Sequence, residues 1–442
     1  MNPMAAQRYE AGLRAMPLAA GIGEITAFNG LVIESRGPNA RLGEVCVLVR
    51  DDLPLLTQVV GFRHDRVLLM PYGSSEGLRV GDRIRATGRS LDVPVGMGFV
   101  GRVVDAFGAP LDGGAPIVEE MRYPATAAPL PPMARSDVDE VLETGVAVLD
   151  TLLTMGKGQR VGVFAGSGVG KSTLLGMMAR HVKADVVVLG LIGERGREVG
   201  DFVDNVLGEE GRRRAVVVAA TSDQPALIRS HATSAAHAMA EYFRDRGLDV
   251  LLIVDSITRY AMAQREIGLA AGEPPTTRGY PPSVFNRLPV LVERGGALRG
   301  RGSVSCIYSV LVEGDDMNEP VADHMRALLD GHIVLSRDIA HRGRLPAVDV
   351  LKSVSRLMGR LATRDEKALA SAVHRLFAAY ESSRDLVDMG AHQRGVNILL
   401  DQAVDLVPAL GDAFHQTPDE RRERHGALAD LRTLLGTQGV NA

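Results

Sequence analysis

The stretch AGSGVGKST (Ala165–Thr173) decides the fold of the central part of this chain. It follows a strand-like run, VGVF (Val161–Phe164), and precedes a helix-like run, LLGMMAR (Leu174–Arg180). A glycine-rich turn between a strand and a helix, closed by Lys-Ser, is the setting of a phosphate-binding loop, or P-loop. The pattern therefore predicts an α/β domain with a nucleoside triphosphate site at one edge of its sheet.

Each residue type in this loop has a chemical reason. Gly166, Gly168 and Gly170 let the backbone wrap around phosphate oxygens, so that its N–H groups point inward. Lys171 should place its ammonium between the β- and γ-phosphates, and Ser172 should offer its hydroxyl to Mg²⁺. We expect the whole loop to bind nucleotide: Ala165, Gly166, Ser167, Gly168, Val169, Gly170, Lys171, Ser172 and Thr173.

Ala165 departs from the strict pattern, which begins with glycine. A methyl group is tolerated there if the backbone φ angle stays negative, so the departure does not remove the site.

Two further segments carry carboxylates at positions where a magnesium–nucleotide complex would need them. LDVLLIVDS (Leu248–Ser256) reads as a buried strand that ends in Asp255, a position suited to the Mg²⁺ shell. LIGERGREVGDF (Leu191–Phe202) presents Glu194 at the same edge, where a carboxylate could polarise the attacking water. The alternative for Glu194 is an ordinary surface ion pair with Arg195 or Arg197.

The hydrophobic pattern divides the chain into parts. Residues 1–20 read either as a short amphipathic helix or as a frayed terminus. Residues 21–95 contain short β segments separated by turn residues, as in a small barrel or sandwich. Within residues 96–360, apolar strand-like runs alternate with helices, which predicts a parallel sheet covered on both faces. These runs are Val161–Ala165, Asp185–Ile192, Arg214–Ala220, Val250–Asp255 and Val304–Val312. Residues 361–442 look helical, and we expect the charged run Asp419–Arg424 to be a solvated helix face.

Composition excludes several classes of protein. The chain has 442 residues, enough for two or three domains, and a formal net charge of −4. This mild acidity, the scarcity of aromatic residues and the lack of a basic stripe argue against a nucleic-acid motor. Two distant cysteines, Cys46 and Cys306, suggest buried reduced thiols rather than a disulfide framework. Glu10 and Arg14 interrupt any signal-peptide core, and no apolar run is long enough to span a membrane, so we expect a cytoplasmic protein.

Longer motifs resemble one family along nearly the whole chain. They are GERGREV (Gly193–Val199), DSITRYAMAQREI (Asp255–Ile267), GEPPTTRGYPPSVFNRLPVLVER (Gly272–Arg294), EGDDMNEP (Glu313–Pro320), LDGHIVLSR (Leu329–Arg337) and PAVDVLKSVSR (Pro346–Arg356). Together they are similar to the flagellar protein-export ATPases and the virulence-type secretion ATPases, which resemble the catalytic subunits of rotary ATP synthases. The resemblance implies an N-terminal β-barrel, a central RecA-type P-loop NTPase core and a C-terminal helical domain.

The resemblance also implies roles for single residues. Lys171 binds phosphate, Glu194 is the general base, and Arg195 belongs to the same catalytic segment. Arg356 becomes an arginine finger that reaches into the neighbouring subunit's site, a contribution worth about 10³ to 10⁵ in rate. Leu345 stands where many relatives carry a tyrosine that stacks on adenine, so a less favourable base contact is expected.

For partners, the resemblance implies a homohexamer that uses ATP and Mg²⁺. It implies contacts with a regulator at the N-terminus, a central stalk protein, export cargo and its chaperones, at the inner-membrane export apparatus. EGDDMNEP reads either as a loop facing the stalk or as an acidic turn that caps a helix.

Three other functions stay open at this point. The chain could serve a virulence-type secretion system instead of a flagellum, or act as the catalytic subunit of a rotary ATP synthase. It could also be a structural ring subunit that binds nucleotide without hydrolysing it, although Glu194 argues against that alternative.

Overall fold

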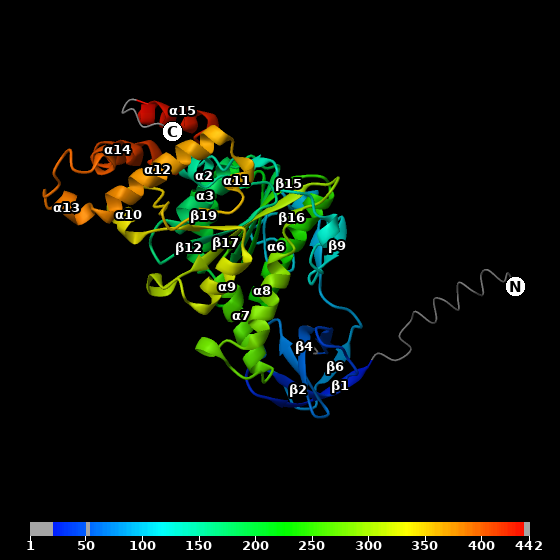
Figure 1. The fold of residues 1–442 in the computed structure, drawn as a ribbon. Coiled ribbons are helices and arrows are strands. Elements are labelled where there is room, and N and C mark those ends of the chain that lie inside the picture. Colours follow the sequence, from blue (N-terminus) through cyan, green and yellow to red (C-terminus); the bar gives the residue numbers. More distant parts are fainter. Residues whose placement is uncertain (1–20, 50–53, 437–442) are drawn as a thin grey trace.

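The computed structural model describes residues 21–49 and 54–436 in three consecutive parts. A small barrel lies at one end, a large α/β domain in the middle and a group of helices at the other end (Figure 1). The predicted fold class is therefore confirmed. The helix considered for residues 1–20 lies outside the described residues.

The N-terminal part is a closed barrel, so the barrel rather than the sandwich is correct. Its strands follow the order β1-β2-β5-β4-β3-β6. They are β1 (Ile22–Phe28), β2 (Ile33–Arg36), β3 (Val45–Leu48), β4 (Leu55–Arg63), β5 (Arg66–Pro71) and β6 (Arg83–Ala86). Alternate side chains such as Ile33, Leu48 and Leu69 fill its interior, and closure leaves no unpaired strand edge among them.

The central sheet has the order β19-β18-β12-β17-β15-β13-β14-β8, with β16 added to β17. All pairs are parallel except β18–β19 and β16–β17. The strands are β8 (Val103–Val104), β12 (Arg160–Ala165), β13 (Val186–Ile192), β14 (Ala215–Ala220), β15 (Asp249–Asp255), β16 (Gly296–Ala297), β17 (Ser303–Leu311), β18 (Gly331–Val334) and β19 (Val354–Ser355). The five long strands match the predicted apolar runs to within one or two residues. The strands β8, β18 and β19 were not predicted, because each is only two to four residues long.

Helices cover both faces of this sheet, because its strands are apolar on both sides. In β13, Val187 and Leu189 face one core, whereas Val186 and Val188 face the other. The first core is closed by α2 (Ala147–Leu152), α3 (Lys171–His181) and the π-helix η3 (Phe202–Leu207), together with the C-terminal helices. The second is closed by α6 (Ala226–Asp245), α7 (Ile257–Ala270), α8 (Pro282–Val292) and α9 (Pro320–Leu328).

Smaller elements connect these parts. Strands β7 (Asp92–Val95) and β9 (Met121–Pro124) pair with each other, as do β10 (Val141–Leu142) and β11 (Met155–Gly156). Short helices are η1 (Met97–Phe99), η2 (Pro132–Ala134), α4 (Gly196–Asp201), α5 (Gly208–Arg212), η4 (Thr277–Gly279), η5 (Glu313–Asp315) and α10 (Arg337–His341). Glu319 caps α9 by accepting a hydrogen bond from Ala322 N at 3.0 Å, so EGDDMNEP includes a helix cap.

The C-terminal part is helical, as predicted, with one error. It contains α11 (Met358–Leu361), α12 (Arg364–Ser382), α13 (Arg384–Asp388), α14 (Ile398–Phe414) and α15 (Arg424–Gly436). The run Asp419–Arg424 is not a helix face. Residues 419–423 lie in the loop before α15, and Arg424 is the first residue of that helix. In the loop, Arg422 donates to Ala413 O at 2.7 Å and Asp419 pairs with Arg180. Asp419, Glu420, Arg421 and Glu423 are exposed to solvent, as expected, but they lie in a loop rather than on one face of a helix.

Two predictions based on composition can be compared with the structure. Cys46 and Cys306 are both buried and unpaired, as expected for reduced thiols. Among the described residues, no helix has the length and apolar character needed to cross a bilayer.

Candidate nucleotide site

The P-loop joins the end of β12 to the start of α3, as its sequence predicts. Gly168 and Gly170 have φ angles of 77° and 87°, which only glycine adopts without strain. Ala165 does not have a positive φ angle, and its methyl group is buried, so the departure from the strict pattern is accommodated. Helix α3 then starts at Lys171, and its free N–H groups and dipole favour an anion at this end.

Strand order brings a carboxylate to this loop. Asp255 ends β15, which is separated from the P-loop strand β12 only by β17. Its Oδ1 atom accepts hydrogen bonds from Lys171 Nζ and, at 2.7 Å, from Ser309 Oγ. Ser309 belongs to the intervening strand β17 and was not predicted. The predicted pairing of P-loop and Asp255 is thus present in the geometry, with Ser309 orienting the carboxylate.

Glu194 is the second carboxylate near the same ammonium. Its Oε1 atom is 3.9 Å from Lys171 Nζ, and its side chain is only 20% exposed. Burial, followed by the negative charge of Asp255, raises the pKa of Glu194 to about 7, although Lys171 opposes the shift. Glu194 is therefore not an ordinary surface ion pair. A carboxylate with a pKa close to neutrality is suited to take a proton from water and to release it again.

Arg259 is a site residue that sequence reasoning missed. It lies in the first turn of α7, four residues after Asp255, and its positive charge lowers the pKa of Glu194. Its Nε atom is buried without a hydrogen-bond partner. A Cβ atom on Gly193 would lie 2.9 Å from Arg259 Cβ, so glycine before Glu194 makes room for this side chain. The motif DSITR contains the residue, but only the fold places it beside Glu194.

Two predicted residues lie apart from this cluster. Arg195 is 77% exposed and pairs with Glu198 at 3.3 Å. Arg356 follows the edge strand β19 and donates a hydrogen bond to Arg326 O at 3.2 Å. Within residues 21–49 and 54–436, no hydrogen bond or ion pair joins Arg356 to Lys171, Glu194 or Asp255.

Leu345 lies beside the P-loop, although it is far from the loop in sequence. A methyl group on Gly170 would be 3.9 Å from Leu345 Cδ2. The backbone of Leu345 is fixed to the C-terminal part, because Gln416 N donates to Leu345 O at 2.8 Å and Leu345 N donates to His415 Nδ1 at 3.4 Å. Its side chain is 40% exposed and thus available to a base that extends from the loop.

The residues present fit Mg²⁺ when it is bound together with a nucleotide. The hydroxyl of Ser172 is at the exposed start of α3, and Asp255 uses only Oδ1 in its hydrogen bonds. Hydroxyl and carboxylate oxygens are ligands that Mg²⁺ prefers. No group of three or more His, Cys, Asp or Glu side chains able to hold a metal occurs in the described parts of the chain. This agrees with a cation that is shared with substrate phosphates rather than held by the protein alone.

Comparison with known proteins identifies the family. The profile of the ATP synthase alpha/beta family, nucleotide-binding domain, matches residues 145–355, and the beta-barrel domain of the same family matches residues 25–88. The T3SS EscN ATPase C-terminal domain matches residues 362–433. The flagellum-specific ATP synthase of Bacillus subtilis (strain 168) is 48% identical over 421 residues, which is 94% of this chain and 95% of that protein. The chain belongs to the flagellar and type III secretion ATPase family.

Other members of the family are nearly as similar. The type 3 secretion system ATPase of Xanthomonas euvesicatoria is 45% identical over 435 residues and 98% of both chains. The assembled ATPase EscN of the enteropathogenic E. coli type III secretion system superimposes with a TM-score of 0.89 at 38% identity, covering 93% of this chain and 100% of EscN. EscN has also been solved in complex with its central stalk EscO.

Proposed function

We propose that this chain hydrolyses Mg-ATP in a homohexameric ring and thereby energises type III protein export, most directly of flagellar components. The observation that carries the proposal is the cluster in which Lys171 forms ion pairs with two carboxylates, those of Asp255 and Glu194. Glu194 is buried and has its pKa raised to about 7, as a general base requires.

In the proposed reaction, a water oxygen attacks the γ-phosphorus, the bond to the β–γ bridging oxygen breaks, and ADP and phosphate leave. The P-loop N–H groups and Lys171 hold the phosphates in line, which supplies positioning and charge stabilisation. Glu194 accepts the proton of the attacking water. Ser172 and Asp255 would hold Mg²⁺, which neutralises charge on the β- and γ-phosphates when it is bound. Arg259 would bind the departing phosphate beside Glu194.

The ring follows from what one chain contains. Arg356 follows β19 at the edge of the sheet and, among the described residues, forms no hydrogen bond or ion pair with the P-loop cluster of its own subunit. We infer that it completes the site of the neighbouring subunit, which requires head-to-tail contacts that close into a ring. The existence of the EscN assembly supports a hexamer.

The remaining assignments are proposals by family. We propose the boundaries 21–95, 96–360 and 361–442 for the ring-forming barrel, the ATPase domain and the helical domain that meets the stalk and cargo. Residues 1–20 would bind the regulator, and the protein would be peripheral to the membrane through partners. Disruption of the gene should abolish filament assembly if the system is flagellar. Loss of secreted virulence proteins with intact swimming would instead favour the injectisome.

The catalytic proposal is tested by the ATP turnover per chain as protein concentration rises, with Lys171→Ala as the blank. Specific activity that climbs to a plateau is expected for an assembling ring. A flat rate that does not exceed the blank would contradict the proposal of an ATPase formed by this chain alone.

A further inference from the structure

A cavity of about 150 Å³ lies where the N-terminal barrel meets helices α6, α7 and α8 of the central part. About 10–15 Å³ of such space holds one water, so the cavity has room for a ligand of about ten non-hydrogen atoms. The barrel side contributes Gln58 of β4 and Tyr72, and the helices contribute Ser234, Gln264 and Arg287, among others. A ligand in this cavity would therefore contact both the barrel and the helices.

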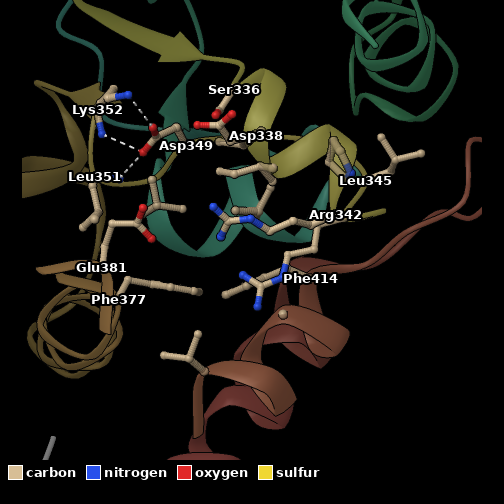
Figure 2. A pocket seen from close by; sticks show the side chains of 18 of the residues that line it. Ser336, Asp338, Arg342, Leu345, Asp349, Leu351, Lys352, Phe377, Glu381 and Phe414 are labelled. Carbon is tan, nitrogen blue, oxygen red and sulfur yellow. Dashed lines mark hydrogen bonds and ion pairs between the residues drawn. The ribbon is translucent and has the colours of Figure 1, made fainter. Parts of the chain in front are cut away.

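This cavity is separate from the nucleotide site, because none of the P-loop residues, Glu194, Asp255 or Arg259 lines it. A second cavity, of about 180 Å³, includes Leu345 in its wall and therefore belongs to the nucleotide site already described (Figure 2). The lining of that second cavity carries three acidic and three basic side chains: Asp338, Asp349, Glu381, Arg342, Arg344 and Lys352. These charges balance, so the second cavity selects neither anions nor cations.

The cavity beside the barrel has a different charge pattern, because no acidic side chain of the described residues lines it. Arg294, which is buried in its wall, is neutralised by Glu241, whose carboxylate accepts from Nε at 2.8 Å and from Nη2 at 2.9 Å. Burial lowers the pKa of His231 to about 4, so this ring is uncharged at neutral pH. Arg287 of α8 is exposed, and its guanidinium forms no hydrogen bond or ion pair within residues 21–49 and 54–436. Arg287 thus gives the wall a positive charge that no acid balances in the described parts of the chain.

Uncharged polar groups form much of the remaining wall. Tyr260 and Gln264 of α7 are each only 4% exposed, and Gln264 Nε2 donates to Ser230 Oγ at 2.5 Å. Three further hydroxyl groups line the cavity and form no hydrogen bond with any described residue: those of Ser90, Thr126 and Ser234. A hydroxyl group can both donate and accept, so this wall suits a ligand that carries hydroxyl groups of its own.

Exposure separates the two kinds of group along the cavity. Arg287, Ser90 and Thr126 are exposed and therefore lie at the opening, whereas Tyr260 and Gln264 are buried and lie deeper. The opening thus offers one guanidinium and two hydroxyl donors, and the interior offers hydroxyl and amide groups without charge.

We propose that this cavity binds a small phosphomonoester of a polyol, of the class of glycerol phosphate. The phosphate would lie at the opening, where Arg287, Ser90 and Thr126 offer donors to its oxygen atoms. The hydroxyl-bearing carbons would lie deeper, beside Tyr260 and Gln264. The proposal uses no residue of the proposed nucleotide site, so it does not depend on the function proposed above.

The test is calorimetric titration of the full chain with sn-glycerol 3-phosphate. We expect saturable binding of one molecule per chain, with the same affinity in Lys171→Ala, which removes the lysine that would bind phosphate in the P-loop. Inorganic phosphate and glycerol should each bind about tenfold more weakly, because each lacks part of the groups that hydrogen-bond to the wall.

Variants of the wall locate the site. Arg287→Gln should weaken glycerol 3-phosphate about fivefold, as for the loss of an exposed ion pair. Arg432→Gln makes the same change of charge at an exposed position of α15 outside the cavity, and it should leave the affinity unchanged. Ser234→Leu places a larger side chain in the cavity and should weaken binding more than Arg287→Gln does.

Several results would overturn the proposal. They are the absence of saturable binding, an equal affinity for inorganic phosphate, and unaltered binding in Arg287→Gln. Binding that is lost in Lys171→Ala would show that the ligand occupies the P-loop instead. Because Arg287 is exposed, its variant remains informative even if Ser234→Leu fails to fold. A protein that binds glycerol 3-phosphate as expected but does not hydrolyse ATP would contradict the proposed function and leave the cavity proposal standing.

Discussion

The pH dependence of ATP hydrolysis gives the sharpest test of Glu194. Its raised pKa, about 7, arises from burial and from the neighbouring carboxylate of Asp255. A general base must be deprotonated to act, so activity should fall as pH falls through this pKa. A group with a pKa of 7 is about 9% ionised at pH 6 and about 91% ionised at pH 8, so kcat/KM should rise about tenfold between these values. An ordinary glutamate, with a pKa of about 4.3, would be ionised throughout and would give a flat profile.

The assay is phosphate release at low ATP concentration, from pH 5.5 to pH 9, at constant ionic strength. Under these conditions kcat/KM reports the ionisation of the free enzyme. Mg²⁺ is kept in excess at every pH so that the protonation state of the substrate does not change. Circular dichroism and the sedimentation of the ring are followed over the same range, which separates a change in catalysis from unfolding or disassembly.

Glu194→Gln is the matched variant, because it keeps the shape of the side chain and removes the titrating group. Its rate should be lower by about 10² to 10⁴, and its profile should be flat between pH 6 and pH 8. ATP affinity should be retained. A flat wild-type profile, or a Glu194→Gln variant with the same acid limb as the wild type, would refute the assignment of Glu194 as the base.

Other predictions address the ring, the base contact and the core. Arg356→Ala should leave the nucleotide affinity of single subunits within about twofold but lower the ATP turnover of the ring about 10³-fold or more. Mixing Arg356→Ala subunits with Lys171→Ala subunits should restore part of the phosphate release, because some interfaces then combine an intact P-loop with an intact Arg356. The absence of recovery at any mixing ratio would count against a site shared between subunits. Leu345→Tyr should add about 0.5–1.5 kcal/mol of stacking on adenine, which lowers KM for ATP about two- to tenfold relative to KM for UTP. If the ratio of kcat/KM for ATP to kcat/KM for UTP did not change, the base would not lie on residue 345. Glu241 accepts a hydrogen bond from the buried guanidinium of Arg294 at 2.8 Å, and Glu241→Ala removes this partner. The variant should lower the free energy of unfolding by about 3–5 kcal/mol in chemical denaturation, because it leaves a buried charge unpaired. The double variant Glu241→Leu/Arg294→Leu removes both charges and should recover much of this loss.

Sequence alone determined the features that depend on local patterns. The P-loop could be located because its glycines, Lys171 and Ser172 are consecutive and lie between a strand run and a helix run. The long strands were predicted to within one or two residues, because strands buried on both faces are continuously apolar. The long motifs also identified the family, because they match in sequence and in order along nearly the whole chain.

Tertiary structure decided which distant groups meet. Asp255 touches Lys171 because only one strand separates β15 from β12, and Ser309 joins them because it lies on that strand. Arg259 packs against Gly193, where a side chain would collide with it, and from this position its charge lowers the pKa of Glu194. The run Asp419–Arg424 shows the same limit, because its charges form contacts with distant partners that local periodicity does not encode. The physical reason is that hydrophobic periodicity determines which segments are strands and helices, whereas the pKa of a carboxylate and the partners of an arginine depend on burial and on neighbours from elsewhere in the chain.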